Sequence, residues 1–160
     1  MMTLETALQS AESLLAPWME SCGRPHPQRI DIALPPEQLL PAVEALVRGR
    51  WGYLSAVSGI DLGPAAEGEP GQLEVLYHFC EGPAVVTLRV SLPQDRAIVP
   101  TVTGLIPSAV LFEQELSEML GVTVSDAPFT GYLFLPEEWP AGVYPLRKSF
   151  HGLNAAPEAA

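Results

Sequence analysis

Apolar residues recur at the helical spacing in three stretches of the chain, and these stretches predict helices over 3–20, 35–49 and 108–120. The second begins with prolines, which fit the first turn of a helix because an N–H is not needed there. Gly49 and Gly121 stand where the second and third helices are predicted to end, since glycine readily adopts the conformation that closes a helix.

Four shorter apolar runs have the length and composition of strands, over 28–34, 53–60, 73–80 and 84–90. The last two flank the tight connection Glu81-Gly82-Pro83 and predict an antiparallel hairpin. The order helix, strand, helix, strand and hairpin predicts one α+β domain, in which helices pack on one face of a mixed or antiparallel sheet.

The last third of the chain loses this periodicity. Beyond Val124, prolines and glycines follow one another at short intervals, which predicts an irregular, proline-rich C-terminal segment. We place one domain at residues 1–150 and expect residues 151–160, which are small and polar, to form a disordered tail.

The charge balance narrows the choice of partners. The chain of 160 residues has 8 Lys and Arg against 19 Asp and Glu, a net charge of −11, which argues against binding to nucleic acid or to an anionic membrane surface. No apolar run approaches the roughly 20 residues that span a bilayer, and the first residues have no basic region of the kind that opens a signal peptide. Cys22 and Cys80 form no motif. We therefore expect reduced thiols and a cytoplasmic location, or one on the cytoplasmic face of a membrane.

The helix predicted over 108–120 carries three glutamates that are candidates for chemistry. Glu115 and Glu118 are three residues apart and share one face, whereas Glu113 points elsewhere. Paired carboxylates can act as acid and base, although a solvated acidic face is the simpler interpretation. Glu118 lies in the last turn, where the helix dipole disfavours a negative charge by roughly 0.3–1 kcal/mol, and a cationic partner would explain it better.

Arg147 and Lys148 form the only pair of cations in the second half of the chain, because residues 97–146 contain no Lys or Arg. Two adjacent cations in a segment with Pro145 could bind carboxylates of this domain or those of a neighbour, and the sequence leaves both open. The pair is too small for a nucleic-acid footprint.

No pattern of metal ligands or catalytic groups is present. The three histidines, His26, His78 and His151, are scattered, and there is no cysteine cluster for an iron–sulfur centre. Phosphate-binding glycine motifs and a nucleophile elbow are also missing. The sequence therefore predicts a chain without a cofactor or an active site of its own.

Several weak motifs in the second half follow one another in a fixed order. The run VPTVTGLIPSA, residues 99–109, leads into FEQELSEMLGV, residues 112–122. LFLPEEW, residues 133–139, and PLRKSF, residues 145–150, come next. This order resembles the signature region of the 30-kDa (C or J) subunit of complex I and of its hydrogenase relatives.

The resemblance implies an α+β domain that has no redox centre and packs against a large catalytic subunit. In that family, the large subunit houses a quinone pocket or a nickel–iron centre, and iron–sulfur clusters lie in neighbouring subunits. The implied roles are docking and structure rather than catalysis. The residues that the resemblance and the sequence assign to the interface are Glu113, Glu115, Glu118, Trp139, Arg147 and Lys148.

The chain departs from the family pattern at two places, and a third feature, the form of residues 118–121, favours one branch of the family. Gln114 stands where the signature has an arginine, and residues 130–134 lack the histidine and arginines expected there. The run 118–121, EMLG, resembles the form found in energy-converting hydrogenases. We therefore expect a peripheral assembly subunit of an ion-pumping [NiFe] hydrogenase, contacting its large and iron–sulfur subunits and reaching the membrane only through them. The alternatives are the equivalent subunit of NADH-quinone oxidoreductase, a stand-alone adaptor and an enzyme using Glu115 and Glu118.

Overall fold

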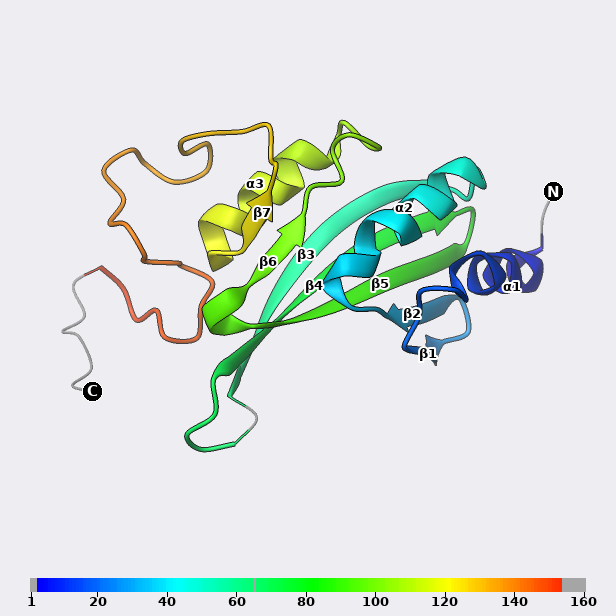
Figure 1. The fold of residues 1–160 in the computed structure, drawn as a ribbon, viewed down its shortest axis with the longest axis horizontal. Coiled ribbons are helices and arrows are strands. Elements are labelled where there is room, and N and C mark those ends of the chain that lie inside the picture. The colour runs from blue at the N-terminus through cyan, green and yellow to red at the C-terminus, as the bar shows by residue number, and fades with distance from the viewer. Residues whose placement is uncertain (1–2, 65, 154–160) are drawn as a thin grey trace.

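The computed structural model describes residues 3–64 and 66–153 and shows a mixed sheet of five strands with helices packed on one face (Figure 1). The strand order is β1-β2-β5-β4-β3, in which β2 and β5 are parallel and the other neighbours are antiparallel. The strands are β1 (Ser21–His26), β2 (Arg29–Ala33), β3 (Tyr53–Pro64), β4 (Gly71–Glu81) and β5 (Ala84–Pro93). This architecture confirms the predicted fold class, and the predicted hairpin is β4 with β5.

The helices are α1 (Leu4–Leu15), α2 (Leu39–Arg48) and α3 (Ala109–Leu120). Short 3-10 turns, η1 (Pro36–Gln38) and η2 (Gln94–Arg96), precede α2 and follow β5. A separate pair of short parallel strands, β6 (Ile98–Pro100) and β7 (Thr123–Ser125), brackets α3.

Three features differ from the prediction. The first helix ends at Leu15 rather than at residue 20, because Pro17 has no N–H to continue the helical hydrogen bonds after Ala16. Strand β1 was not predicted, since its sequence SCGRPH has no apolar pattern and all its residues are exposed. Proline is tolerated there because β1 is an edge strand. Strands β6 and β7 have three residues each, too few for a periodicity to show.

Strand β4, which lies between β5 and β3, has one buried apolar face towards the helices and a more polar opposite face. Val75, Tyr77 and Phe79 are buried beneath the helices, whereas the alternate residues face the opposite side of the sheet. On that side Arg89 forms ion pairs with the buried carboxylates of Glu74 and Asp31. His78 shares a hydrogen bond of 3.0 Å with Thr87 on that side of the sheet.

Helix α3 lies directly on β3. A Cβ atom on Gly59 would stand 2.2 Å from Cδ1 of Leu120 and 2.6 Å from Cδ1 of Leu116. Only a glycine allows this approach. It fixes α3 at the edge of the sheet, where the irregular C-terminal segment (residues 126–153) then runs past the end of the helix (Figure 1). No helix or strand occurs in the described part of that segment, as predicted; the expected tail begins at 151, and residues 154–160 lie outside the described residues.

Candidate functional site

Glu113 is a fully buried carboxylate on the side of α3 that faces the core. Its oxygens accept hydrogen bonds from the backbone N–H of Val102, at 2.7 Å, and from the hydroxyl of Thr101, at 2.6 Å. Burial raises the pKa of the Glu113 carboxyl, and these two hydrogen bonds only partly oppose the rise. Glu113 therefore fastens the segment after β6 to α3 from inside the protein.

Glu118 is buried on a different side of the helix and holds the C-terminal segment. The backbone N–H groups of Leu133, Phe134 and Leu135 all donate to its carboxylate, at 2.7, 2.8 and 2.8 Å. Burial alone would raise the pKa of the Glu118 carboxyl, but these hydrogen bonds outweigh it and the pKa lies below its ordinary value. The expected cationic partner is thus replaced by three backbone amides.

The side chain of Arg147 caps the C-terminus of α3. Its Nε donates to the carbonyl oxygen of Leu120, and its guanidinium lies 5.4 Å from the centre of the Tyr144 ring. The backbone N–H of Leu146 donates to the carbonyl of Met119 at 3.0 Å. A cation at the C-terminus of a helix meets the negative end of its dipole, so this contact stabilises both the helix and the segment.

Lys148 attaches the same segment to β3. Its backbone N–H donates to Oδ2 of Asp61 at 2.8 Å, and its Nζ donates to the carbonyl of Leu62 at 2.9 Å. The sequence left open whether Arg147 and Lys148 bind carboxylates of this domain or of a neighbour; within the described residues both side chains bind backbone carbonyls of this chain instead. The contact of Asp61 with the C-terminal segment was missed by sequence reasoning, because Asp61 and Lys148 are 87 positions apart in the chain.

Trp139 packs inside the C-terminal segment. Its indole N–H donates to the carbonyl of Val143 at 2.8 Å, and its ring centre lies 6.0 Å from that of Phe150. The residue is half buried, so it shapes the segment while keeping part of its ring at the surface.

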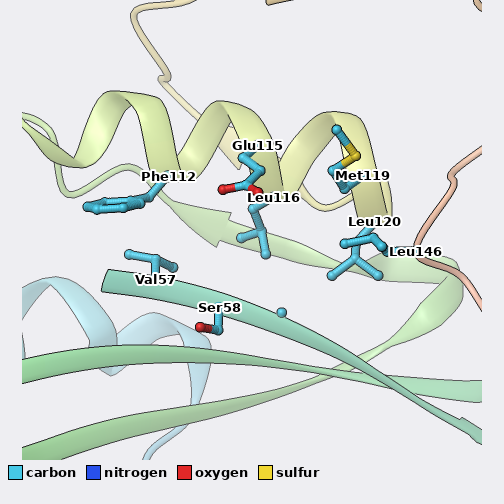
Figure 2. A pocket seen from close by; sticks show the side chains of 9 residues that line it. Val57, Ser58, Phe112, Glu115, Leu116, Met119, Leu120 and Leu146 are labelled. Atoms are coloured by element: carbon cyan, nitrogen blue, oxygen red, sulfur yellow. The ribbon is translucent and has the colours of Figure 1, made fainter. Parts of the chain in front are cut away.

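Glu115 is exposed and lies at a hollow of about 240 Å³ between α3 and β3, here called the α3 hollow (Figure 2). Phe112, Met119 and Leu146 contribute apolar walls. Glu118 lines a different hollow, beside Trp139. Among the described residues, the two carboxylates of the suggested acid–base pair thus line different hollows, and this geometry gives no support to the enzyme alternative.

Three further features concern metal binding, membrane insertion and the cysteines. Within residues 3–64 and 66–153, no three His, Cys, Asp or Glu side chains are grouped so that they could hold a metal ion. Over the same ranges, every helix is too short or too polar to cross a bilayer. Both cysteines are free thiols, as predicted.

Replacing Glu113 by glutamine is expected to preserve or raise stability at neutral pH, by up to about 1 kcal/mol. The amide can accept from Val102 and donate to Thr101, and it carries no buried charge. Because the folded protein raises the pKa of Glu113, the carboxyl stabilises the fold most at low pH. That contribution is lost as pH rises through the folded pKa. Urea unfolding across pH should show this loss in the natural chain and not in Glu113→Gln, with Glu115→Gln as the exposed control.

The protein is an α+β domain whose irregular C-terminal segment is held to α3 by the buried carboxylate of Glu118. Comparison with known proteins gives the family of this domain. The chain belongs to the family described as "Respiratory-chain NADH dehydrogenase, 30 Kd subunit", whose model matches residues 32–155. The predicted family is therefore confirmed.

Curated relatives come from both hydrogenase and NADH-quinone complexes. The chain is 34% identical over 87 residues to the beta subunit of the membrane-bound hydrogenase of Pyrococcus furiosus, covering 53% of this chain and 50% of that one. It is 35% identical over 121 residues to the C/D subunit of NADH-quinone oxidoreductase from Pectobacterium carotovorum, covering 71% and 20%. Formate hydrogenlyase subunit 5 of Escherichia coli is 38% identical over 63 residues, covering 39% and 11%. The chain thus spans half or less of the length of these relatives.

Two solved structures share the fold. The trypsin-resistant fragment of Nqo5 superposes with a TM-score of 0.63 at 20% identity, covering 79% of this chain and 98% of the fragment. A chain of the membrane-bound sulfane sulfur reductase, an archaeal respiratory membrane complex, superposes with a TM-score of 0.67 at 19% identity, covering 91% and 86%.

Proposed function

We propose that this chain is an assembly subunit of a complex I-like, ion-pumping membrane redox complex, and that it docks onto the large catalytic subunit without carrying a cofactor. It would lie on the hydrophilic arm at the cytoplasmic face of the membrane and contact the membrane only through its partners. The iron–sulfur clusters, and in a hydrogenase the nickel–iron centre, would belong to neighbouring subunits.

The observation that carries this proposal is an apolar tip on the C-terminal segment, formed by Tyr132, Leu133 and Phe134. Their side chains are 45%, 55% and 43% exposed, although all three are large and apolar. Adjacent exposed apolar side chains are typical of protein–protein interfaces. The backbone of this tip is held by Glu118, so the tip is fixed in position before a partner arrives, which lowers the entropy lost on binding.

The interface residues predicted from the sequence take two roles in this proposal. Glu118, Arg147 and Lys148 act from within, because their contacts shape the segment that presents the tip. Glu113 also acts from within, but it fastens the segment after β6. Glu115 is exposed beside the α3 hollow and is available to a cation of the partner.

The lengths of the relatives support a large partner. In the C/D subunit of NADH-quinone oxidoreductase and in formate hydrogenlyase subunit 5, the matched residues make up only 20% and 11% of the protein. Because these relatives carry the matched domain within a much longer chain, we infer that the domain packs against a large neighbouring subunit here.

We favour the hydrogenase branch, because residues 118–121 have the hydrogenase-like form and because the Pyrococcus furiosus hydrogenase subunit is among the relatives. The second candidate is the equivalent subunit of NADH-quinone oxidoreductase, which the longer match to the C/D subunit of that complex favours.

A tagged chain purified from gently solubilised native membranes tests the proposal. Recovery of a nickel–iron large subunit supports the hydrogenase branch, whereas recovery of NADH-binding and quinone-site subunits supports the second candidate. A chain that elutes alone contradicts both.

Replacing Leu133 and Phe134 together by serine is expected to lower recovery of the large subunit at least about tenfold, because the apolar contacts at the centre of an interface carry most of its binding energy. The melting temperature should stay within about 2 °C, since the residues are exposed. Leu111→Ser is the matched control, because Leu111 is 54% exposed on α3 itself. Equal recovery for both variants would remove the tip from the interface.

A further inference from the structure

Helix α2 ends on an arginine in a conformation that normally requires glycine. Arg50 has a φ of 51°, in the left-handed region. The N–H of Arg50 donates to Val47 and the N–H of Trp51 donates to Leu46, which is the usual closure of a helix around a left-handed residue. Gly49, one residue earlier, is right-handed with a φ of −71°. The fold thus places a long cationic side chain where a glycine would be less strained.

Beside Arg50 lies a hollow of about 480 Å³, here called the Arg50 hollow. Its walls are mainly apolar and come from the end of α2, the start of β3 and the loop before α3. Tyr53, at its rim, is 66% exposed, whereas Trp51 is buried and its indole N–H is fixed to the carbonyl of Ala7 at 2.9 Å. The hollow therefore has a rigid apolar floor and an accessible mouth.

The charge at this hollow differs from that of the rest of the molecule. The chain has a net charge of −11, yet among residues 3–64 and 66–153 no Asp or Glu lines the Arg50 hollow. Of the seven other Lys and Arg residues, all but Arg96 bind groups within the described part of this chain. Arg24, Arg29, Arg48 and Arg89 pair with carboxylates, and Arg147 and Lys148 bind backbone carbonyls. Within the described residues the Arg50 guanidinium has no ion pair or hydrogen bond, so its charge is available to a ligand.

We propose that the Arg50 hollow is a second docking site, which binds an acidic, apolar segment of a neighbouring subunit. One apolar side chain of that segment enters the hollow, and a carboxylate close to it pairs with the Arg50 guanidinium, in bidentate geometry that arginine suits. The site lies where α2 ends and β3 begins, at the opposite end of the sheet from the apolar tip (Figure 1). This inference rests on the proposed function, because it requires the chain to be part of a complex.

Two substitutions separate binding from strain. Arg50→Gly is expected to raise the melting temperature of the isolated chain, because glycine relieves the left-handed backbone, and to lower retention of the chain in its purified native complex about tenfold. Arg50→Glu should lower retention further, since it brings like charges together. Arg48→Glu is the control, because Arg48 is a neighbouring exposed arginine that pairs with Glu44.

Retention of Arg50→Glu at the natural level, in a complex that retains the natural chain, would overturn the docking site and leave the proposed function intact. If the natural chain itself elutes alone, the proposed function fails and the docking site fails with it.

A photo-cross-linking residue at Tyr53 identifies the occupant. Mass analysis of the native complex should find cross-links to a peptide of another subunit in which an apolar residue lies close to Asp or Glu. Cross-links to a second copy of this chain, to a basic peptide, or none above those from the same residue placed at Ile98, which is also exposed, would contradict the proposal.

Discussion

Replacing Glu118 by glutamine is expected to detach the C-terminal segment from α3 while the five-stranded sheet stays folded. The carboxylate accepts three backbone N–H groups, whereas a glutamine amide offers one oxygen and turns its own N–H groups towards the remaining donors. Hydrogen bonds to a charged group contribute about 1.5–3 kcal/mol each when buried. Because residues 133 and 134 are exposed and water can replace part of the loss, we expect docking of the segment to weaken by about 2–3 kcal/mol.

Limited trypsin digestion measures this detachment, since Arg147 and Lys148 are cleavage sites inside the segment. When cleavage proceeds through transient opening, a loss of about 2 kcal/mol raises the cleavage rate roughly 30-fold. Hydrogen exchange at the N–H groups of 133–135 should accelerate in parallel. Glu115→Gln, on the exposed side of the same helix, should change neither. Unaltered protection in Glu118→Gln would show that other contacts hold the segment.

The same carboxylate predicts how docking responds to acid. Because the folded protein lowers the pKa of Glu118, its contribution is fully present above the ordinary glutamate pKa of about 4.3 and is lost as pH falls through the folded value. The pKa of Glu113 is shifted in the opposite direction, so its contribution is largest in acid. Acidification therefore loosens the attachment of residues 133–135 while it strengthens that of residues 101–102.

The spacing of apolar residues along the sequence was sufficient to predict most of the helices and strands. Helical spacing located α2 and α3, and the turn at residues 81–83 located the central hairpin, because burial on one face imposes those patterns. Strand β1 was not predicted, because an exposed edge strand has no buried face that would impose a pattern of apolar residues. The left-handed backbone of Arg50 was not predicted, for another reason. Gly49 is the residue type expected to close the helix, whereas the left-handed residue in the structure is the neighbouring Arg50, and a local sequence pattern does not distinguish the two positions.

The candidate site was located by sequence but its contacts were not. Glu118 was recognised as a charge in an unfavourable position, and the missing partner was sought among cations. Its partners are backbone amides 15 to 17 residues away, and every residue except proline has such an amide, so no residue type marks them. The pattern of charged side chains in a sequence therefore predicts ion pairs more readily than it predicts hydrogen bonds from backbone N–H groups to a carboxylate.

Replacing Gly121 by alanine is expected to destabilise the protein by about 2–4 kcal/mol, because two effects add. Gly121 has a φ of 68°, where a residue with a Cβ is strained by roughly 1–2 kcal/mol. A Cβ there would also stand 2.4 Å from two ring atoms of Tyr144. The ring must move, and it carries Arg147 away from the carbonyl of Leu120, so the end of α3 and the C-terminal segment should loosen together. Chemical unfolding and trypsin digestion measure the two consequences.

Two variants separate strain from collision. Gly131 also has a positive φ, of 73°, but a Cβ there would meet no atom within 4 Å, so Gly131→Ala should lose only the backbone contribution of roughly 1–2 kcal/mol. Adding Tyr144→Ala to Gly121→Ala should remove the collision, so that the two substitutions together cost less than their sum. Equal losses at Gly121 and Gly131, with additive behaviour towards Tyr144, would mean that the ring does not press on the helix end. The attachment of the segment would then depend on Glu118, Arg147 and Lys148 rather than on the packing of Tyr144.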